Sequence, residues 1–134
     1  MPRMAPEPTP ETQHFWDGTL RGELLLQRNK ETGIAYFPPR PFDPRTGSRD
    51  VEVFKASGRA TLYSYVINVR PRPDMGTEPY AIAVVQLEEG PRMMTNIVNC
   101  PQTPEALQLD MPLQVTFEKI SDTIALPLFE PAKG

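Results

Sequence analysis

Proline is the residue type that most constrains this chain, because 17 of its 134 residues are proline and four of them fall within the first ten. A proline inside a helix removes a backbone donor and clashes with the preceding turn, so frequent prolines exclude long helices. Most of the others stand between short apolar runs rich in β-branched and aromatic residues, which is typical of strands joined by turns. The sequence therefore predicts a mainly β fold.

A short helix is predicted near the N-terminus. Thr9 is the expected N-cap, Pro10 takes the first helical position, and Gly18 is expected to end the helix. Apolar runs at residues 23–28 and 34–37 follow, separated by a turn, and this pattern predicts a β-hairpin.

Longer apolar segments with alternating polarity fill the second half of the chain and predict five strands. They are residues 59–69, 80–90, 92–100, 112–120 and 123–131. One helical turn, opened by Thr103 or Pro104, is predicted between the third and fourth segments. This is the element order of an OB-fold, a small and partly open Greek-key barrel. The chain is thus expected to comprise a flexible tail at 1–8, a helix and ribbon at 9–50, and an OB-fold at 51–131.

Two turns of similar sequence, NKETG at residues 29–33 and DPRTG at residues 43–47, stand in the first half. With cysteine at the first and fourth positions, each would read C-x-x-C-G, the knuckle of a structural zinc ribbon. The four positions are instead occupied by Asn29, Thr32, Asp43 and Thr46. Amide and hydroxyl groups are poor ligands for zinc, so no bound metal is expected. On the residues alone, two ordinary turns capped by Asn or Asp remain the alternative.

The sequence offers little for catalysis. The one histidine, His14, lies beside two aromatic residues on the predicted helix, where a packing or surface role is typical. The one cysteine, Cys100, has no second histidine to activate it. A single cysteine excludes a disulfide within the chain and fits a reducing compartment. Glu88 and Glu89 fall in a hairpin turn, where solvated charges are usual. The chain is therefore not expected to be an enzyme on its own.

Charge and hydropathy argue against two classes of partner, nucleic acids and membranes. The formal net charge is −3, and residues 59–134 carry six basic and nine acidic side chains, whereas nucleic-acid-binding proteins present a broad basic surface. No apolar run approaches the roughly 18 residues that span a bilayer, and the N-terminus is no signal peptide. We expect a cytoplasmic protein without nucleic-acid or membrane partners. A module that binds single-stranded nucleic acid remains an alternative, because Tyr63 and Tyr65 are predicted to share one strand face, where bases can stack.

Several motifs, taken in order, resemble one known family. They are FWDGTLRGELLLQR, YFPPRPF, SRDVE, SGRATLYSY, AVVQLEEGPRMMTNIV and ALPLFEP. The family comprises bacterial and archaeal proteins with an N-terminal helix, a rubredoxin-like zinc ribbon and an acyl-CoA-associated OB-fold, and the resemblance covers about residues 14–131. Because the family usually has cysteine at the four ribbon positions, this chain resembles a member with a degenerate, metal-free ribbon. We expect packing of Tyr36, Phe37 and Phe42 against Leu24–Leu26 or a partner to hold that ribbon.

The resemblance implies a function. Members of the family are accessory subunits of thiolase-like enzymes, so this chain is expected to be a non-catalytic subunit that docks on such an enzyme and helps to form its CoA channel. The partner would be a thiolase, an acyltransferase or a steroid side-chain aldolase, in a hetero-oligomer to which a MaoC-like hydratase can belong. No cofactor is expected on the chain itself, and acyl-CoA is expected as the ligand of the complex. A standalone acyl-CoA-binding protein is the further alternative.

Arginines and aromatic residues near the predicted turns and loops are the candidate contacts with CoA phosphates or with an acidic partner, because arginine binds phosphate through paired donors. The candidates are Tyr36, Phe37, Arg40, Arg45, Arg49, Arg70, Arg72 and Tyr80. The alternative role for the arginines is solubility and balance against nearby acids.

Overall fold

The computed structural model of the protein describes residues 5–69 and 78–133, and it confirms the mainly β fold. The helix is α1 (Gln13–Leu20), and the strands are β1 (Leu25–Asn29), β2 (Ala35–Tyr36), β3 (Val51–Lys55), β4 (Arg59–Asn68), β5 (Tyr80–Leu87), β6 (Arg92–Thr95), β7 (Pro112–Lys119) and β8 (Ala125–Pro131). Residues 1–4 of the predicted tail and the candidates Arg70 and Arg72 lie outside the described residues. No helix in the described part of the chain is long and apolar enough to cross a membrane.

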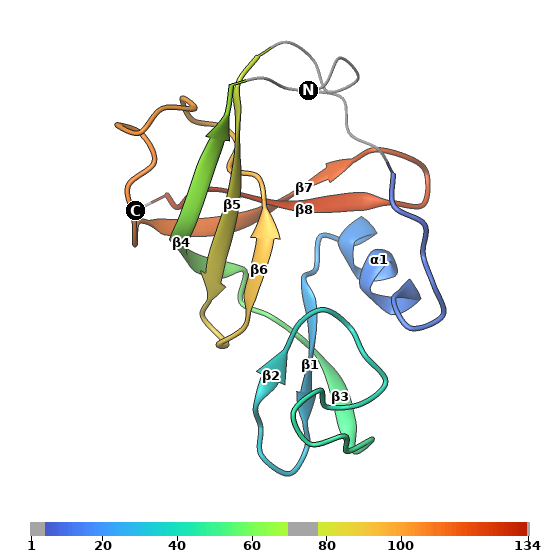
Figure 1. The fold of residues 1–134 in the computed structure, drawn as a ribbon. Helices are drawn as coiled ribbons and strands as arrows, with labels where there is room; N and C mark the ends of the chain where they lie inside the picture. The colour runs from blue at the N-terminus through green and yellow to red at the C-terminus, as the bar shows by residue number, and fades with distance from the viewer. Residues whose placement is uncertain (1–4, 70–77, 134) are drawn as a thin grey trace.

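The strands form two antiparallel sheets. The smaller sheet has the order β2-β1-β3, and the larger has the order β6-β5-β4-β7-β8. Figure 1 shows the larger sheet curling so that β7 and β8 cross behind β4 and β5, which leaves a half-barrel. The OB-fold predicted for the second half is confirmed, as are the hairpins that join β1 to β2 and β5 to β6.

The small sheet contains a third strand, β3, in addition to the predicted hairpin of β1 and β2. Strand β3 pairs with β1 along its whole length, from Leu25 opposite Lys55 to Asn29 opposite Val51. Residues 51–55, which the boundary at residue 50 placed with the OB-fold, therefore belong to the ribbon sheet by their pairing, and the domain division itself stays a prediction.

Helix α1 begins and ends later than predicted. Thr12, not Thr9, is its N-cap, because Thr9 first closes a separate turn in which its carbonyl accepts from the Gln13 amide at 2.9 Å. Gly18 lies inside the helix and does not end it. A Cβ at this position would stand 2.7 Å from Leu25 Cδ1, so the glycine lets the helix approach β1 closely. Close approach, not termination, is what this glycine provides.

Three predictions about the half-barrel have different outcomes. The helical turn opened by Thr103 is confirmed, since its carbonyl accepts from the Leu107 amide at 3.0 Å. The strand predicted over 92–100 ends at Thr95, because the chain then leaves β5 and Ile97 bridges to β8. The prediction that Tyr63 and Tyr65 share one face of their strand is wrong.

A register shift between Leu62 and Ser64 separates the two tyrosines. Tyr63 is 47% exposed and lies under the Arg92 guanidinium, at 3.8 Å from its ring centroid, whereas Tyr65 packs against the core. The single face on which bases were expected to stack therefore does not exist.

One hydrophobic core joins the two sheets. Its cluster includes Phe15 from α1 and Leu24 and Leu26 from the ribbon side, together with Leu62 and Phe129 from the half-barrel. Figure 1 shows α1 lying between the ribbon sheet and the β7–β8 hairpin. Its Phe15 belongs to the core cluster that contains residues of both. The ribbon is therefore packed onto the half-barrel through shared apolar side chains.

Gly58, between β3 and β4, tests how the two sheets are joined. It has φ +84, and a Cβ there would stand 2.7 Å from Val115 Cγ1. We expect Gly58→Ala to lower the free energy of unfolding by about 1–3 kcal/mol in urea titrations, because backbone strain adds to a steric clash. Gly22→Ala is the matched control, since Gly22 has φ +76 and nothing within 4 Å. Equal losses in the two variants would show that the Val115 contact is not a constraint.

Candidate functional site

An apolar pocket of about 350 Å³ lies where α1, the ribbon and the half-barrel meet. Its lining residues are Thr12, Phe15 and Trp16 at α1, Phe37, Pro38 and Pro39 after β2, Met93, Met94, Thr95 and Asn96 at β6, and Leu126, Pro127 and Leu128 in β8. None of these side chains is ionisable. A pocket of this size and lining suits an uncharged apolar group, with a few polar atoms to orient it.

The pocket exists because the barrel is open on one side. Strands β6 and β8 are the two edges of the five-stranded sheet, and they meet only over a short seam. There the Thr95 hydroxyl donates to the Pro127 carbonyl at 3.1 Å, and the Phe129 amide donates to the Asn96 carbonyl at 3.2 Å. The pocket lies alongside this seam, with α1 and the segment after β2 as its remaining walls.

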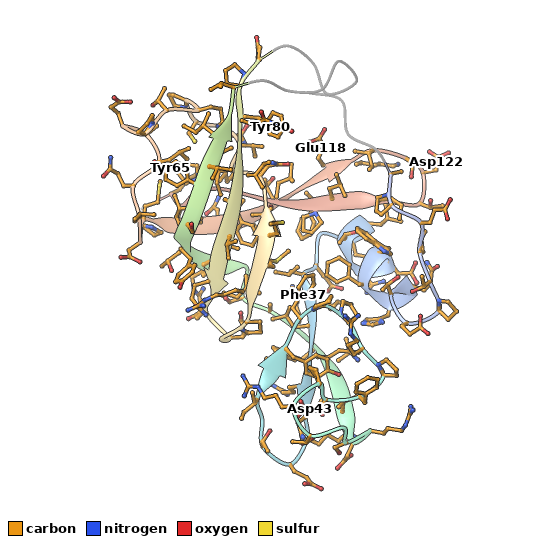
Figure 2. All side chains as sticks on the ribbon, viewed as in Figure 1. Phe37, Asp43, Tyr65, Tyr80, Glu118 and Asp122 are labelled. Atoms are coloured by element: carbon orange, nitrogen blue, oxygen red, sulfur yellow. The ribbon has the colours of Figure 1, made fainter. Side chains whose placement is uncertain are left out.

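Aromatic rings form the wall that faces the seam. Phe15 makes an edge-to-face contact with Trp16, with ring centroids 5.0 Å apart, and a tilted contact with Phe37 at 5.5 Å. Figure 2 shows Phe37 where the ribbon approaches β6 and α1. Phe37 is thus the one predicted site residue, among those in the described part of the chain, that lines the pocket. Phe42, expected to pack with it, is 36% exposed.

The other ribbon candidates divide into one buried ring and three exposed arginines. Tyr36 is only 7% exposed, and its hydroxyl donates to the Arg40 carbonyl at 2.9 Å, so it acts inside the ribbon. The side chains of Arg40, Arg45 and Arg49 are exposed, and within the described residues no carboxylate forms an ion pair with any of them. They are available to an external anion, but they lie outside the pocket lining.

Tyr80 lies elsewhere. It begins β5, where its hydroxyl accepts from the Asn68 amide nitrogen at 3.1 Å, and Figure 2 shows it at the end of β5 remote from Phe37. The predicted set is therefore not one surface: the ribbon residues and Tyr80 stand apart. Arg70 and Arg72, predicted to lie near Tyr80, are outside the described residues.

The two ribbon turns share three kinds of hydrogen bond. The Asn29 and Asp43 carbonyls accept from the Gly33 and Gly47 amides at 2.8 and 2.7 Å. A side-chain oxygen of each residue accepts from the backbone amide two residues later, that of Glu31 or Arg45, in both cases at 2.8 Å. The Thr32 and Thr46 hydroxyls each accept from the amide two residues later at 3.2 Å. Side-chain oxygens in these turns thus accept hydrogen bonds from the backbone amides that, in a zinc knuckle, point toward cysteine sulfur.

The donor set of these turns does not fit zinc. The Asn29 amide nitrogen donates to an Asp43 carboxylate oxygen at 2.9 Å, and the two residues are only 2% and 3% exposed. This direct bond joins the two knuckles, and only one of the four residues, Asp43, could supply an anionic ligand. Among the described residues, no three His, Cys, Asp or Glu side chains gather in a way that suits a metal ion. A metal-free ribbon stays a prediction.

His14 and Cys100, which the sequence offered as possible catalytic residues, are both partly buried. Burial lowers the pKa of His14, against a smaller opposite effect of Asp17, and leaves its Nε2 without a partner among the described residues. Burial raises the pKa of Cys100, which reduces the thiolate fraction. Neither change activates a nucleophile.

The sequence did not indicate the pocket residues of β6 or their proximity to β8. Met93 and Met94 read as ordinary strand residues, and more than 30 positions separate them from Leu126 and Leu128. Only the curl of the sheet brings these edges together. The available signals were two proline-containing segments, YFPPRPF, which contains Phe37, and ALPLFEP, which contains Leu126 to Leu128.

Comparison with known proteins identifies the family. A family model described as the C-terminal OB-fold domain of ChsH2 matches residues 55–118. A DUF35 domain-containing scaffold protein of Methanocaldococcus jannaschii is 35% identical over 101 residues, which are 74% of this chain and 70% of that protein. The chain belongs to the DUF35 family. The resemblance found in the sequence motifs is thereby confirmed.

Two further matches name enzymes. The 3-oxo-4,17-pregnadiene-20-carboxyl-CoA hydratase alpha subunit of Mycobacterium tuberculosis is 32% identical over 119 residues, or 89% of this chain. The chain spans only 37% of the length of that subunit. A solved chain described as Ltp2-ChsH2(DUF35) aldolase superposes with a TM-score of 0.81 at 28% identity, covering 95% of this chain and 98% of that one.

The ribbon pair gives a prediction for acid. The hydrogen bond from Asn29, followed by that from the Arg45 amide, holds the pKa of Asp43 below its ordinary value. A depressed folded pKa adds stability above the unfolded pKa of about 3.9, and that stability is lost as the pH falls through the folded value. We therefore expect the stability gap between the wild type and Asp43→Asn, measured by urea unfolding, to narrow below about pH 4. A gap independent of pH would contradict the role of the carboxylate.

Proposed function

We propose that this chain is a non-catalytic accessory subunit or domain of an acyl-CoA enzyme complex, and that its partner is a thiolase-like enzyme. The observation that carries the proposal is the fit over almost the whole chain to the DUF35 chain of an aldolase. The similarity to a CoA-thioester hydratase subunit and to scaffold proteins supports the same class of role.

The chemistry of the chain agrees with an accessory role. Burial lowers the pKa of its histidine and raises the pKa of its cysteine, and neither shift generates a thiolate nucleophile. In this proposal the nucleophile and the acid–base groups come from the partner. A hetero-oligomer, with a MaoC-like hydratase as a further member, is the assembly that we propose.

The pocket and the arginines suggest a division of labour. An uncharged apolar pocket suits the acyl part of a CoA thioester or the apolar side chains that surround it in the partner. The side chains of Arg40, Arg45 and Arg49, which form no ion pair within the described residues, suit CoA phosphates or an acidic partner surface. In this proposal the ribbon arginines contact the negative charges of CoA or of the partner. The pocket beside the seam between β6 and β8 contacts apolar groups.

Co-expression tests the assembly. The chain is expected to co-elute with the thiolase-like enzyme encoded nearest to it, as one species of defined native mass, and turnover of the acyl-CoA substrate should fall when the chain is omitted. Separate elution with unchanged turnover would refute the proposal. Binding of acyl-CoA by the isolated chain, without any complex, would instead favour the standalone binding protein.

A charge at the pocket rim should weaken the complex. Met94 lines the pocket and is 71% exposed, so Met94→Glu is expected to leave the fold intact. Because a carboxylate is costly to bury against apolar surface, we expect affinity for the partner to fall at least about tenfold in titration calorimetry. Leu109→Glu is the control, since Leu109 is 62% exposed and does not line the pocket. Equal effects of the two variants would exclude the seam as the contact.

A further inference from the structure

Loop 37–43, which runs from Phe37 to Asp43, carries three residues of the pocket wall and yet forms no strand. Its backbone must be held by other groups, because unpaired backbone groups at a buried position are unfavourable. In a zinc ribbon the metal would supply this restraint by joining the two knuckles. The residues in this chain do not fit a zinc ion, so the restraint has a different origin.

Buried polar side chains of the ribbon sheet contact the loop at two points. At its middle, the Arg40 amide donates to Gln27 Oε1 at 2.7 Å, and the Arg40 carbonyl accepts from the Tyr36 hydroxyl at 2.9 Å. At its end, Asn29 donates to the Asp43 carboxylate at 2.9 Å. Gln27, Asn29, Tyr36 and Asp43 are each no more than 8% exposed.

The Asn29–Asp43 bond has one possible polarity. Asn29 Oδ1 accepts from the Glu31 amide, so the amide nitrogen is the group left to face the second turn. Asp43 uses one carboxylate oxygen for the Arg45 amide and the other for Asn29. An amide opposite a carboxylate therefore places a donor against an acceptor between the two turns, whereas two carboxylates, or two amides held in these orientations, would not.

We infer that the polar network of Gln27, Asn29, Tyr36 and Asp43 takes the place of the zinc ion in this ribbon, and that it fixes loop 37–43 and with it one wall of the pocket. The network differs from a metal site in a testable way. It needs no ligand from outside the chain, so neither chelators nor thiol oxidation should release the loop.

Exchanging the two side chains tests the bond directly. In Asn29→Asp two carboxylates face each other, and in Asp43→Asn two amides do, so each single variant should lower Tm by at least about 5 °C. The double variant restores one amide and one carboxylate in the mirror arrangement, which the matching turns permit. Its Tm should return to within about 2 °C of the wild type. Additive losses in the double variant would overturn the inference.

Two controls keep the test decisive. Thr32→Ala changes an exposed position of the first knuckle and should shift Tm by less than about 2 °C. The wild-type chain, purified from zinc-containing medium, should hold far less than one zinc per chain and keep its Tm in a strong chelator. A stoichiometric zinc ion, or a Tm lowered by the chelator, would overturn the inference even if a single variant failed to fold.

Discussion

The backbone of Arg40 is bonded on both sides by buried side chains of the ribbon sheet, and the position of the pocket wall depends on that restraint. Gln27 accepts from its amide and Tyr36 donates to its carbonyl, while Asn29 bonds to Asp43 three residues later. A segment with four prolines among residues 38–44 cannot pair along a strand, because proline lacks the amide donor. Side chains therefore provide what a strand ladder would normally provide.

The half-barrel accounts for the other side of the pocket. Its sheet stops short of closure, so the edges of β6 and β8 meet over a short seam and leave apolar side chains beside it. Helix α1 covers this region because Gly18 allows it to lie close to β1, and Phe15 then joins the ribbon, the helix and the half-barrel in one cluster. The ribbon and the OB-fold depend on each other for a complete apolar interior.

Much of the fold followed from the residues themselves. Prolines predicted short β elements, alternating apolar runs predicted the five strands, and the NKETG and DPRTG turns predicted two knuckles of equal geometry. The misses have local causes. Thr9 closes a turn before the helix begins, and a bulge after Leu62 rotates Tyr63 away from Tyr65. The residue types at positions 29 and 43 predicted poor zinc ligands, but a bond between Asn29 and Asp43 could not be predicted without the sheet that brings the turns together.

The central claim is that buried side chains, without a metal, hold loop 37–43 in place. Amide hydrogen exchange at Arg40 tests it most directly, because that amide has a side-chain acceptor, Gln27 Oε1, and no strand partner. The account predicts exchange well below the rate of an unstructured peptide, and the same rate with and without a strong zinc chelator. Exchange at the unstructured rate, or acceleration on adding the chelator, would contradict it.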